Sequence, residues 1–178
     1  MTDQPRRPTA PPLAYDWPAL AGEAQAAVQR REQAFPKLVE HLGQDAAESE
    51  LSTWRAIAAE WRWATTHRET PEAPKAGRYE RIAMLERSLA RCERDLRREH
   101  GLLPHDVRQL LRTTTLDIME RVYGDQFAPL LDAHLRRDRV AALLWWQRRT
   151  GPDSLRFLVE TTIELRTRLR GNEIRRAA

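Results

Sequence analysis

The chain has 178 residues, with 30 basic side chains, 26 acidic side chains and a formal net charge of +4. This length favours one domain, with at most a flexible arm attached to it. The single cysteine, Cys92, excludes an internal disulfide and therefore a disulfide-stapled secreted fold. The longest apolar run, residues 140–146, is far shorter than the roughly 20 residues that cross a bilayer. Residues 1–12 lack the apolar segment of a signal peptide, so we expect a cytoplasmic protein with no membrane contact.

The basic side chains are almost all arginines, because only Lys37 and Lys75 are lysines. Arginine offers a planar fork of donors that suits phosphate and carboxylate groups. Residues 1–50 carry five basic and eight acidic side chains, whereas residues 51–178 carry 25 and 18. A basic body behind a slightly acidic first segment favours a polyanionic partner.

Prolines and capping residues divide the first half of the chain. Residues 1–15 contain four prolines, and we expect them to form a disordered or extended arm. The first helix is expected to begin at Asp16, and Pro36 must kink it or start a new one. The capping-box spacing of Asp45 and Glu48 predicts the start of the next helix, and its apolar face at helical spacing places Trp54 and Trp61 in the core. Residues 69–77 are expected to form a linker-like loop.

Residues 78–100 predict a long helix with a heptad seam, which Gly101 is expected to end. A further helix is expected from Pro104 to Gly124, followed by helices over residues 125–149 and 155–169. No segment shows the alternating pattern of a strand. The sequence therefore predicts an all-α, six- to seven-helix bundle with short loops. Its single helical domain is expected over residues 16–171, with a frayed tail over residues 172–178.

Enzyme signatures are absent: the chain has no GxGxxG, Walker A, GxSxG or HExxH motif. Cys92 lies on the predicted seam, which favours a buried, unreactive thiol. His100 and His105 flank a predicted turn with Glu99 and Asp106, and we interpret the four as charges at helix ends, since their spacing fits no zinc pattern. We expect no catalytic residue, no metal ion and no cofactor. An enzyme would need a buried polar cluster that the sequence pattern cannot reveal.

The first candidate site is a row of arginines on the outer face of the predicted helix over residues 78–100. It consists of Arg87, Arg91, Arg94 and Arg98. The row is about 16 Å long at a rise of about 1.5 Å per residue, and it could follow a nucleic-acid backbone. The alternative is an ordinary solvated face, which the i, i+4 spacing of Glu93 and Arg97 favours.

The second candidate site surrounds the Trp145–Trp146 pair. It consists of Arg136, Arg137, Arg139, Trp145, Arg148 and Arg149. Helical geometry places Trp146 toward the core and Trp145 toward the surface. Trp145 could stack on a base, or an arginine could cover it through a cation–π contact.

Six tryptophans are many for this length, and Trp63 lies away from the apolar stripe of its predicted helix. This surplus favours contact with another protein or a second copy of the chain. We therefore expect a non-catalytic accessory subunit of a nucleoprotein assembly, which contacts DNA or RNA backbones without reading their sequence. The alternative is a helical adaptor or oligomerisation protein that binds no nucleic acid.

Overall fold

The computed structural model describes residues 9–70, 72–150, 159, 160 and 162. Within these residues the secondary structure is helical, with no strand, which confirms the all-α prediction. The elements are α1 (Trp17–Gln33), α2 (Phe35–Leu42), α3 (Gln44–Thr66), α4 (Arg78–Leu102), α5 (His105–Leu110), α6 (Leu116–Tyr123), a 3-10 turn η1 (Gly124–Gln126) and α7 (Ala128–Thr150). None of the described helices is both long and apolar enough to cross a membrane.

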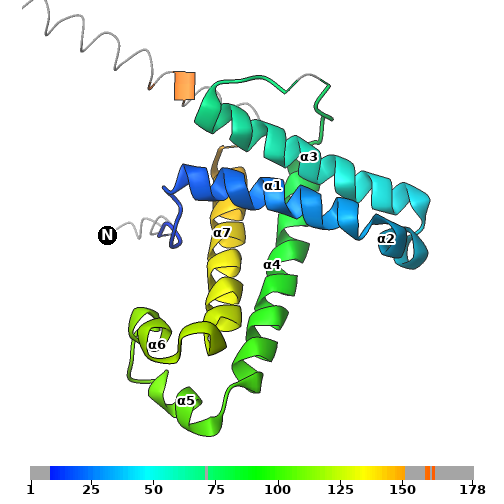
Figure 1. The fold of residues 1–178 in the computed structure, drawn as a ribbon. Helices are drawn as coiled ribbons and strands as arrows, with labels where there is room; N and C mark the ends of the chain where they lie inside the picture. Colours follow the sequence, from blue (N-terminus) through cyan, green and yellow to red (C-terminus); the bar gives the residue numbers. More distant parts are fainter. Residues whose placement is uncertain (1–8, 71, 151–158, 161, 163–178) are drawn as a thin grey trace, which may run out of the picture.

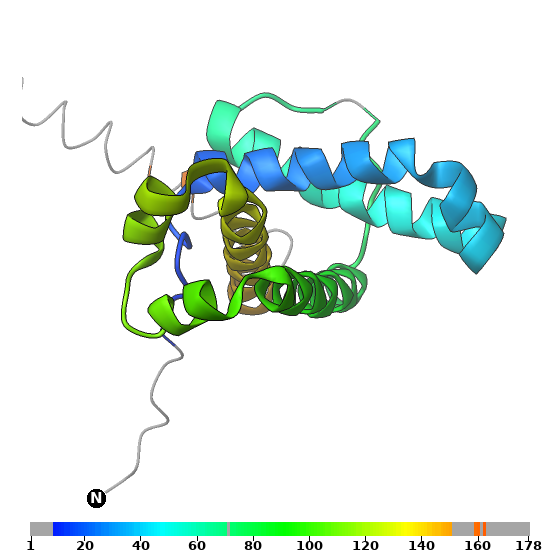
Figure 2. The same ribbon diagram turned by 60° about the horizontal axis from the view of Figure 1, so that its bottom comes forward.

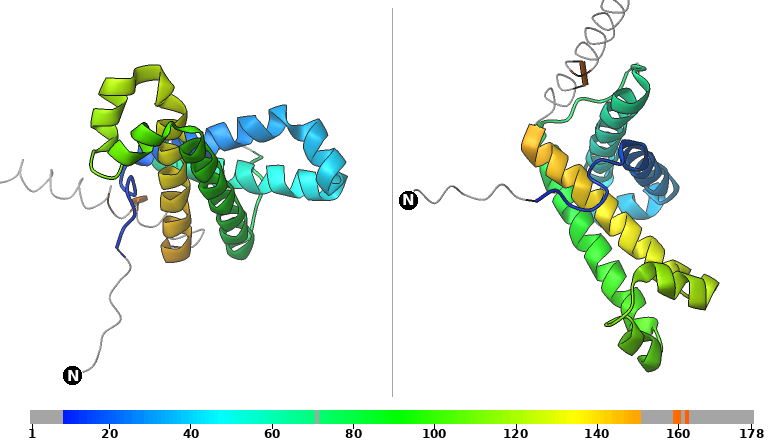
Figure 3. Two further views of the ribbon diagram at one scale, coloured as in Figure 1. Left: turned by 90° about the horizontal axis from the view of Figure 1, so that it is seen from below. Right: turned by 90° about the vertical axis from the view of Figure 1, so that its left-hand side faces the viewer.

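Two antiparallel helix pairs cross each other (Figure 1). Helix α1 packs along α3, with α2 at the turn between them, and α4 packs along α7. The α1–α3 pair lies across one end of the α4–α7 pair, and α5 and α6 lie at the other end (Figures 2 and 3).

Local sequence explains where the first helices begin and end. The Asp16 carboxylate accepts a hydrogen bond from the Ala19 amide at 3.1 Å, which confirms the predicted start of α1. Helix α1 ends at Gln33, and α2 begins at once with Pro36 in its first turn. Because proline is tolerated only in a first turn, it separates two helices here, as predicted.

The prediction of one helix from Pro104 to Gly124 is wrong. Helices α5 and α6 are separated by a turn over residues 111–115. The Thr113 hydroxyl bonds the Leu110 carbonyl at 3.2 Å, and three consecutive threonines compete for backbone groups in this way. Gly101 was also expected to end α4, but the helix continues to Leu102.

Three tryptophans hold the two helix pairs together. The rings of Trp17, Trp61 and Trp146 meet edge to face, with centroids 5.7 to 6.4 Å apart. Trp61 and Trp146 are buried, as is Trp54, which confirms their predicted core positions. A second, smaller core lies at the far end and is formed by Val107, Met119, Phe127 and Leu130.

Buried ion pairs join the same two layers. The Arg31 guanidinium bonds the Glu50 carboxylate at 2.7 Å and the Ser88 hydroxyl at 3.3 Å, which links α1, α3 and α4. On the other side, the Glu60 carboxylate accepts bonds from Arg81 at 2.7 Å and from Gln147 at 2.6 Å. Glu50 is thus paired within the α1–α3 pair, and Glu60 is paired with donors from α4 and α7, as burial of charge requires.

The last residues of the predicted arm pack against the helices. The Trp146 indole donates a hydrogen bond to the Ala14 carbonyl at 2.6 Å, and Ala14 is buried. Tyr15 meets the Trp145 and Trp146 rings edge to face. Residues 11–15 therefore belong to the packed domain, because the tryptophan pair offers them a donor and an aromatic surface. Residues 1–8, most of the predicted last helix and the predicted tail lie outside the described residues.

We predict that Trp146→Phe lowers the free energy of unfolding by about 1–3 kcal/mol, because the buried Ala14 carbonyl loses its donor. Urea denaturation measures the change, and limited proteolysis near Tyr15 reports release of the N-terminal turn. Trp145→Phe is the matched control, since it removes an equal volume and is expected to leave the N-terminal turn protected. Equal proteolysis in the two variants would contradict this role of Trp146.

Candidate functional site

The ten arginine and tryptophan positions singled out in the sequence lie on two neighbouring helices. Helices α4 and α7 run antiparallel and pack along most of their length (Figure 3). The start of α7 therefore lies beside the end of α4, and the end of α7 beside its start. The positions thus lie on adjacent helices, and the surrounding acids decide which of their charges are paired.

The first arginines of α7 are half-buried, and two of the three lie beside acids. Arg136 lies 3.8 Å from the Glu23 carboxylate and 3.9 Å from the Asp95 carboxylate, between α1 and α4. Arg137 pairs with Asp138 at 3.1 Å. Arg139 is also half-buried, and its Nε has no hydrogen-bond partner among the described residues. These side chains mainly serve the packing of α7.

The last two arginines of α7 also contact groups within the fold. The Arg148 guanidinium bonds Glu86 of α4 at 2.6 Å, and the Arg148 carbonyl accepts a bond from Arg78 at 2.7 Å. The Arg149 guanidinium lies 5.0 Å from the centre of the Trp145 ring. Of the two interpretations of Trp145, the structure has the cation–π contact, and Tyr15 meets the same ring edge to face.

The arginines of α4 are arranged differently, because Arg87, Arg91, Arg94 and Arg98 are all exposed. Arg98 pairs with Glu99 at 2.9 Å and lies 3.7 Å from Asp95. In the described part of the chain, the other three have no carboxylate within ion-pair distance. Arg87 has only a 3.8 Å contact with the Met84 sulfur.

Arg97 joins this exposed row, which sequence reasoning missed. Its spacing from Glu93 favoured an ion pair, yet the structured regions contain no such pair and Arg97 is exposed. The signal was present in its position three residues after Arg94, on the outer side of the helix. We call Arg87, Arg91, Arg94 and Arg97 the α4 arginine face.

The pattern of α4 explains why its arginines are unpaired. Met84, Leu85, Ser88 and Cys92 are buried against neighbouring helices. Glu86 and Asp95 lie on the side that meets α7 and form ion pairs with its arginines. These two acids are therefore used within the fold, whereas Glu93 is exposed and forms no ion pair among the described residues, and positive charge predominates on the outer side.

Arg91 acts on a buried cation nearby. The pKa of Arg31 is lowered to about 10, chiefly by burial; the Glu50 carboxylate raises it, and the positive charges of Arg91 and Arg30 contribute to the lowering. An anion bound at Arg91 would relieve this repulsion. The charge of the α4 arginine face is thus incompletely compensated inside the protein.

The described part of the chain shows neither a reactive thiol nor a cluster of metal ligands. Burial raises the pKa of the Cys92 thiol above its ordinary value, which keeps it protonated. No group of three or more histidine, cysteine, aspartate or glutamate side chains within residues 9–70 and 72–150 could hold a metal ion.

Comparisons with known proteins add no relative: no family model, no curated protein and no solved structure matches the chain. The chain's own geometry therefore carries every functional argument.

His134 on α7 supplies a test of the electrostatics beside these helices. Burial lowers the pKa of His134, the charges of Arg137 and His100 lower it further, and Asp138 partly offsets them. Between the folded and unfolded pKa values the unfolded chain binds more protons, so stability falls as the pH decreases below about 6.5. We predict that His134→Gln loses less stability than the wild type between about pH 7.5 and about pH 5.5. Urea denaturation at several pH values measures this, and parallel curves would contradict it.

Proposed function

We propose that this protein is a non-catalytic helical subunit that binds the phosphate backbone of nucleic acid through the α4 arginine face, without reading sequence. The observation that carries the proposal is the exposure of Arg87, Arg91, Arg94 and Arg97 with no carboxylate partner among the described residues. The arginines of α7 are secondary in this proposal, because Arg136, Arg137 and Arg148 form ion pairs and Arg149 lies against the Trp145 ring.

The dimensions of the face support a backbone contact. Residues 87–98 span about 16 Å, and one strand of a duplex carries a phosphate about every 3.4 Å along the axis. Several phosphates could therefore face the row at once. Contacts to phosphates position a protein on nucleic acid without reading its sequence, so the binding expected of this row is independent of sequence.

The salt dependence of binding tests this proposal directly. Each neutralised phosphate contributes about 0.7 to 0.9 to the slope of log affinity against log salt. We predict that R87Q/R91Q/R94Q makes this slope shallower by about 2–3 for generic DNA or RNA. Fluorescence anisotropy at several salt concentrations measures the slope on duplex and single-stranded probes.

The matched control is R62Q/R68Q/R121Q, which removes the same charge from exposed positions outside α4. This variant is expected to keep the wild-type slope, because its α4 arginine face is intact. Its net charge equals that of R87Q/R91Q/R94Q, so a difference between the two variants reflects the position of the arginines. Equal loss in both would show that only overall charge matters. A wild-type protein that fails to bind at low salt would overturn the proposal.

The alternative function, an adaptor that binds protein, is favoured by one observation. Ile118 and Val122 lie one turn apart on α6 and are 48% and 66% exposed. Pairs of exposed apolar side chains at this spacing suit a helix-packing contact.

Sedimentation distinguishes the two functions. Under our proposal the free protein sediments as a monomer across the concentration range, and I118D/V122D leaves nucleic-acid binding unchanged. A concentration-dependent dimer that I118D/V122D dissociates without unfolding would favour the adaptor instead.

A further inference from the structure

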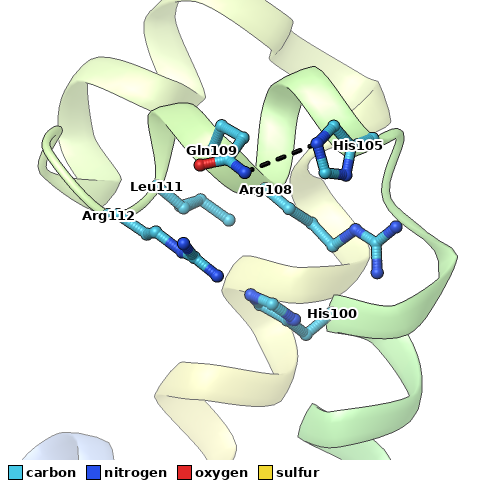
Figure 4. Close-up of a pocket in the computed structure, with 6 residues that line it drawn as sticks. All are labelled: His100, His105, Arg108, Gln109, Leu111 and Arg112. Atoms are coloured by element: carbon cyan, nitrogen blue, oxygen red, sulfur yellow. Dashed lines mark hydrogen bonds between the residues drawn. The ribbon is translucent and has the colours of Figure 1, made fainter.

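A pocket of about 300 Å³ lies at the corner where α4 ends and α5 begins (Figure 4). Figure 4 shows His100 at the end of α4 and Arg112 in the turn after α5 pointing toward each other across it. The lining residues are His100, His105, Arg108, Gln109, Leu111 and Arg112. The end of α4, helix α5 and the turn after α5 thus bring their side chains to one space.

The polar groups of this pocket are almost all nitrogen atoms. Two guanidiniums, two imidazoles and one amide line it, and no carboxylate does. The nearby Glu99 carboxylate is engaged by Arg98 at 2.9 Å, outside the lining. A site of this composition attracts an anion and offers it several donors.

Arg108 adds an independent observation. Its Nε is buried and has no hydrogen-bond partner among the described residues. A buried donor without an acceptor costs free energy that a bound acceptor would recover. The Gln109 amide nitrogen lies 3.4 Å from the His105 ring, which leaves the amide close to the same space.

The size of the pocket narrows the ligand class. A water molecule takes about 30 Å³, so the space exceeds what a bare oxyanion needs. Leu111 supplies an apolar wall against which an organic group could lie. Two guanidiniums and two imidazoles together offer more donors than a single carboxylate can accept, which favours the three terminal oxygens of a phosphate.

We propose that this corner pocket binds a phosphate monoester, through Arg108 and Arg112 with the two histidines beside them. The site is separate from the α4 arginine face and does not require it. The same chemistry occurs in a small phosphorylated metabolite and in the terminal phosphate of a nucleic-acid strand, so the experiment includes both sources.

The test is a titration of the full chain followed by NMR signals of the histidine rings. We expect adenosine 5′-monophosphate to shift the signals of His100 and His105 saturably, whereas adenosine leaves them unchanged. Variant R112Q, at an exposed position, is expected to weaken this binding about tenfold, because a charged hydrogen bond is lost. The matched control R121Q is expected to bind like the wild type.

A pair of oligonucleotides, one with a 5′-phosphate and one with a 5′-hydroxyl, separates the two sources. A preference for the phosphorylated strand that R112Q abolishes assigns the pocket to a strand end. Saturable binding of the monophosphate without that preference assigns it to a small phosphorylated molecule.

Either result supports the site, and R87Q/R91Q/R94Q is expected to leave it unaffected. Absence of saturable shifts at millimolar adenosine 5′-monophosphate would overturn the proposal. Equal binding by wild type and R112Q would overturn it as well, and neither result would affect backbone binding by α4.

Discussion

The crossing of two helix pairs at Trp17, Trp61 and Trp146 is the contact on which the other features depend. The three rings come from α1, α3 and α7 and meet edge to face, so they fix how the layers cross. Large aromatic side chains contribute much of the buried area in a core of this size. Arg31, which pairs with Glu50 and bonds Ser88 of α4, and the Arg81–Glu60 pair then fix the position of α4 against the α1–α3 pair. Without this crossing, α4 would have no fixed inner and outer side.

The electrostatic character of the surface follows from that division. A helix placed between two neighbours uses its acids toward them, and Glu86 and Asp95 are used in this way. Arg136 and Arg148 of α7 are the partners of these acids, so their charges are partly neutralised within the fold. Arg87, Arg91, Arg94 and Arg97 have no such partner in the described structure and remain on the outer side. Unequal pairing, more than the total charge of +4, therefore distinguishes one helix from the other.

Sequence reasoning reached the helical class, the start at Asp16 and the break at Pro36, because each depends on local backbone preferences. It identified Trp54, Trp61 and Trp146 as core from periodicity alone. It failed where tertiary contacts decide: Arg81 and Ser88 are buried because α1 and α3 supply their partners. It also treated the arginines of α7 and α4 alike, since sequence spacing cannot tell which acids another helix brings near. Sequence reasoning could not predict the corner pocket for the same reason, although it noted that His100 and His105 flank one turn.

The presence of two separate cores has a consequence for how the molecule moves. Val107, Met119, Phe127 and Leu130 form a small cluster of their own, away from the tryptophans. A region with so few buried contacts opens at a lower free-energy cost than the main body, and its amide hydrogens exchange sooner. Helices α5 and α6 can thus unfold and refold as a unit while the crossed pairs stay intact. The far end of the protein is in this sense a semi-independent cap, whose order a ligand held between its segments would increase.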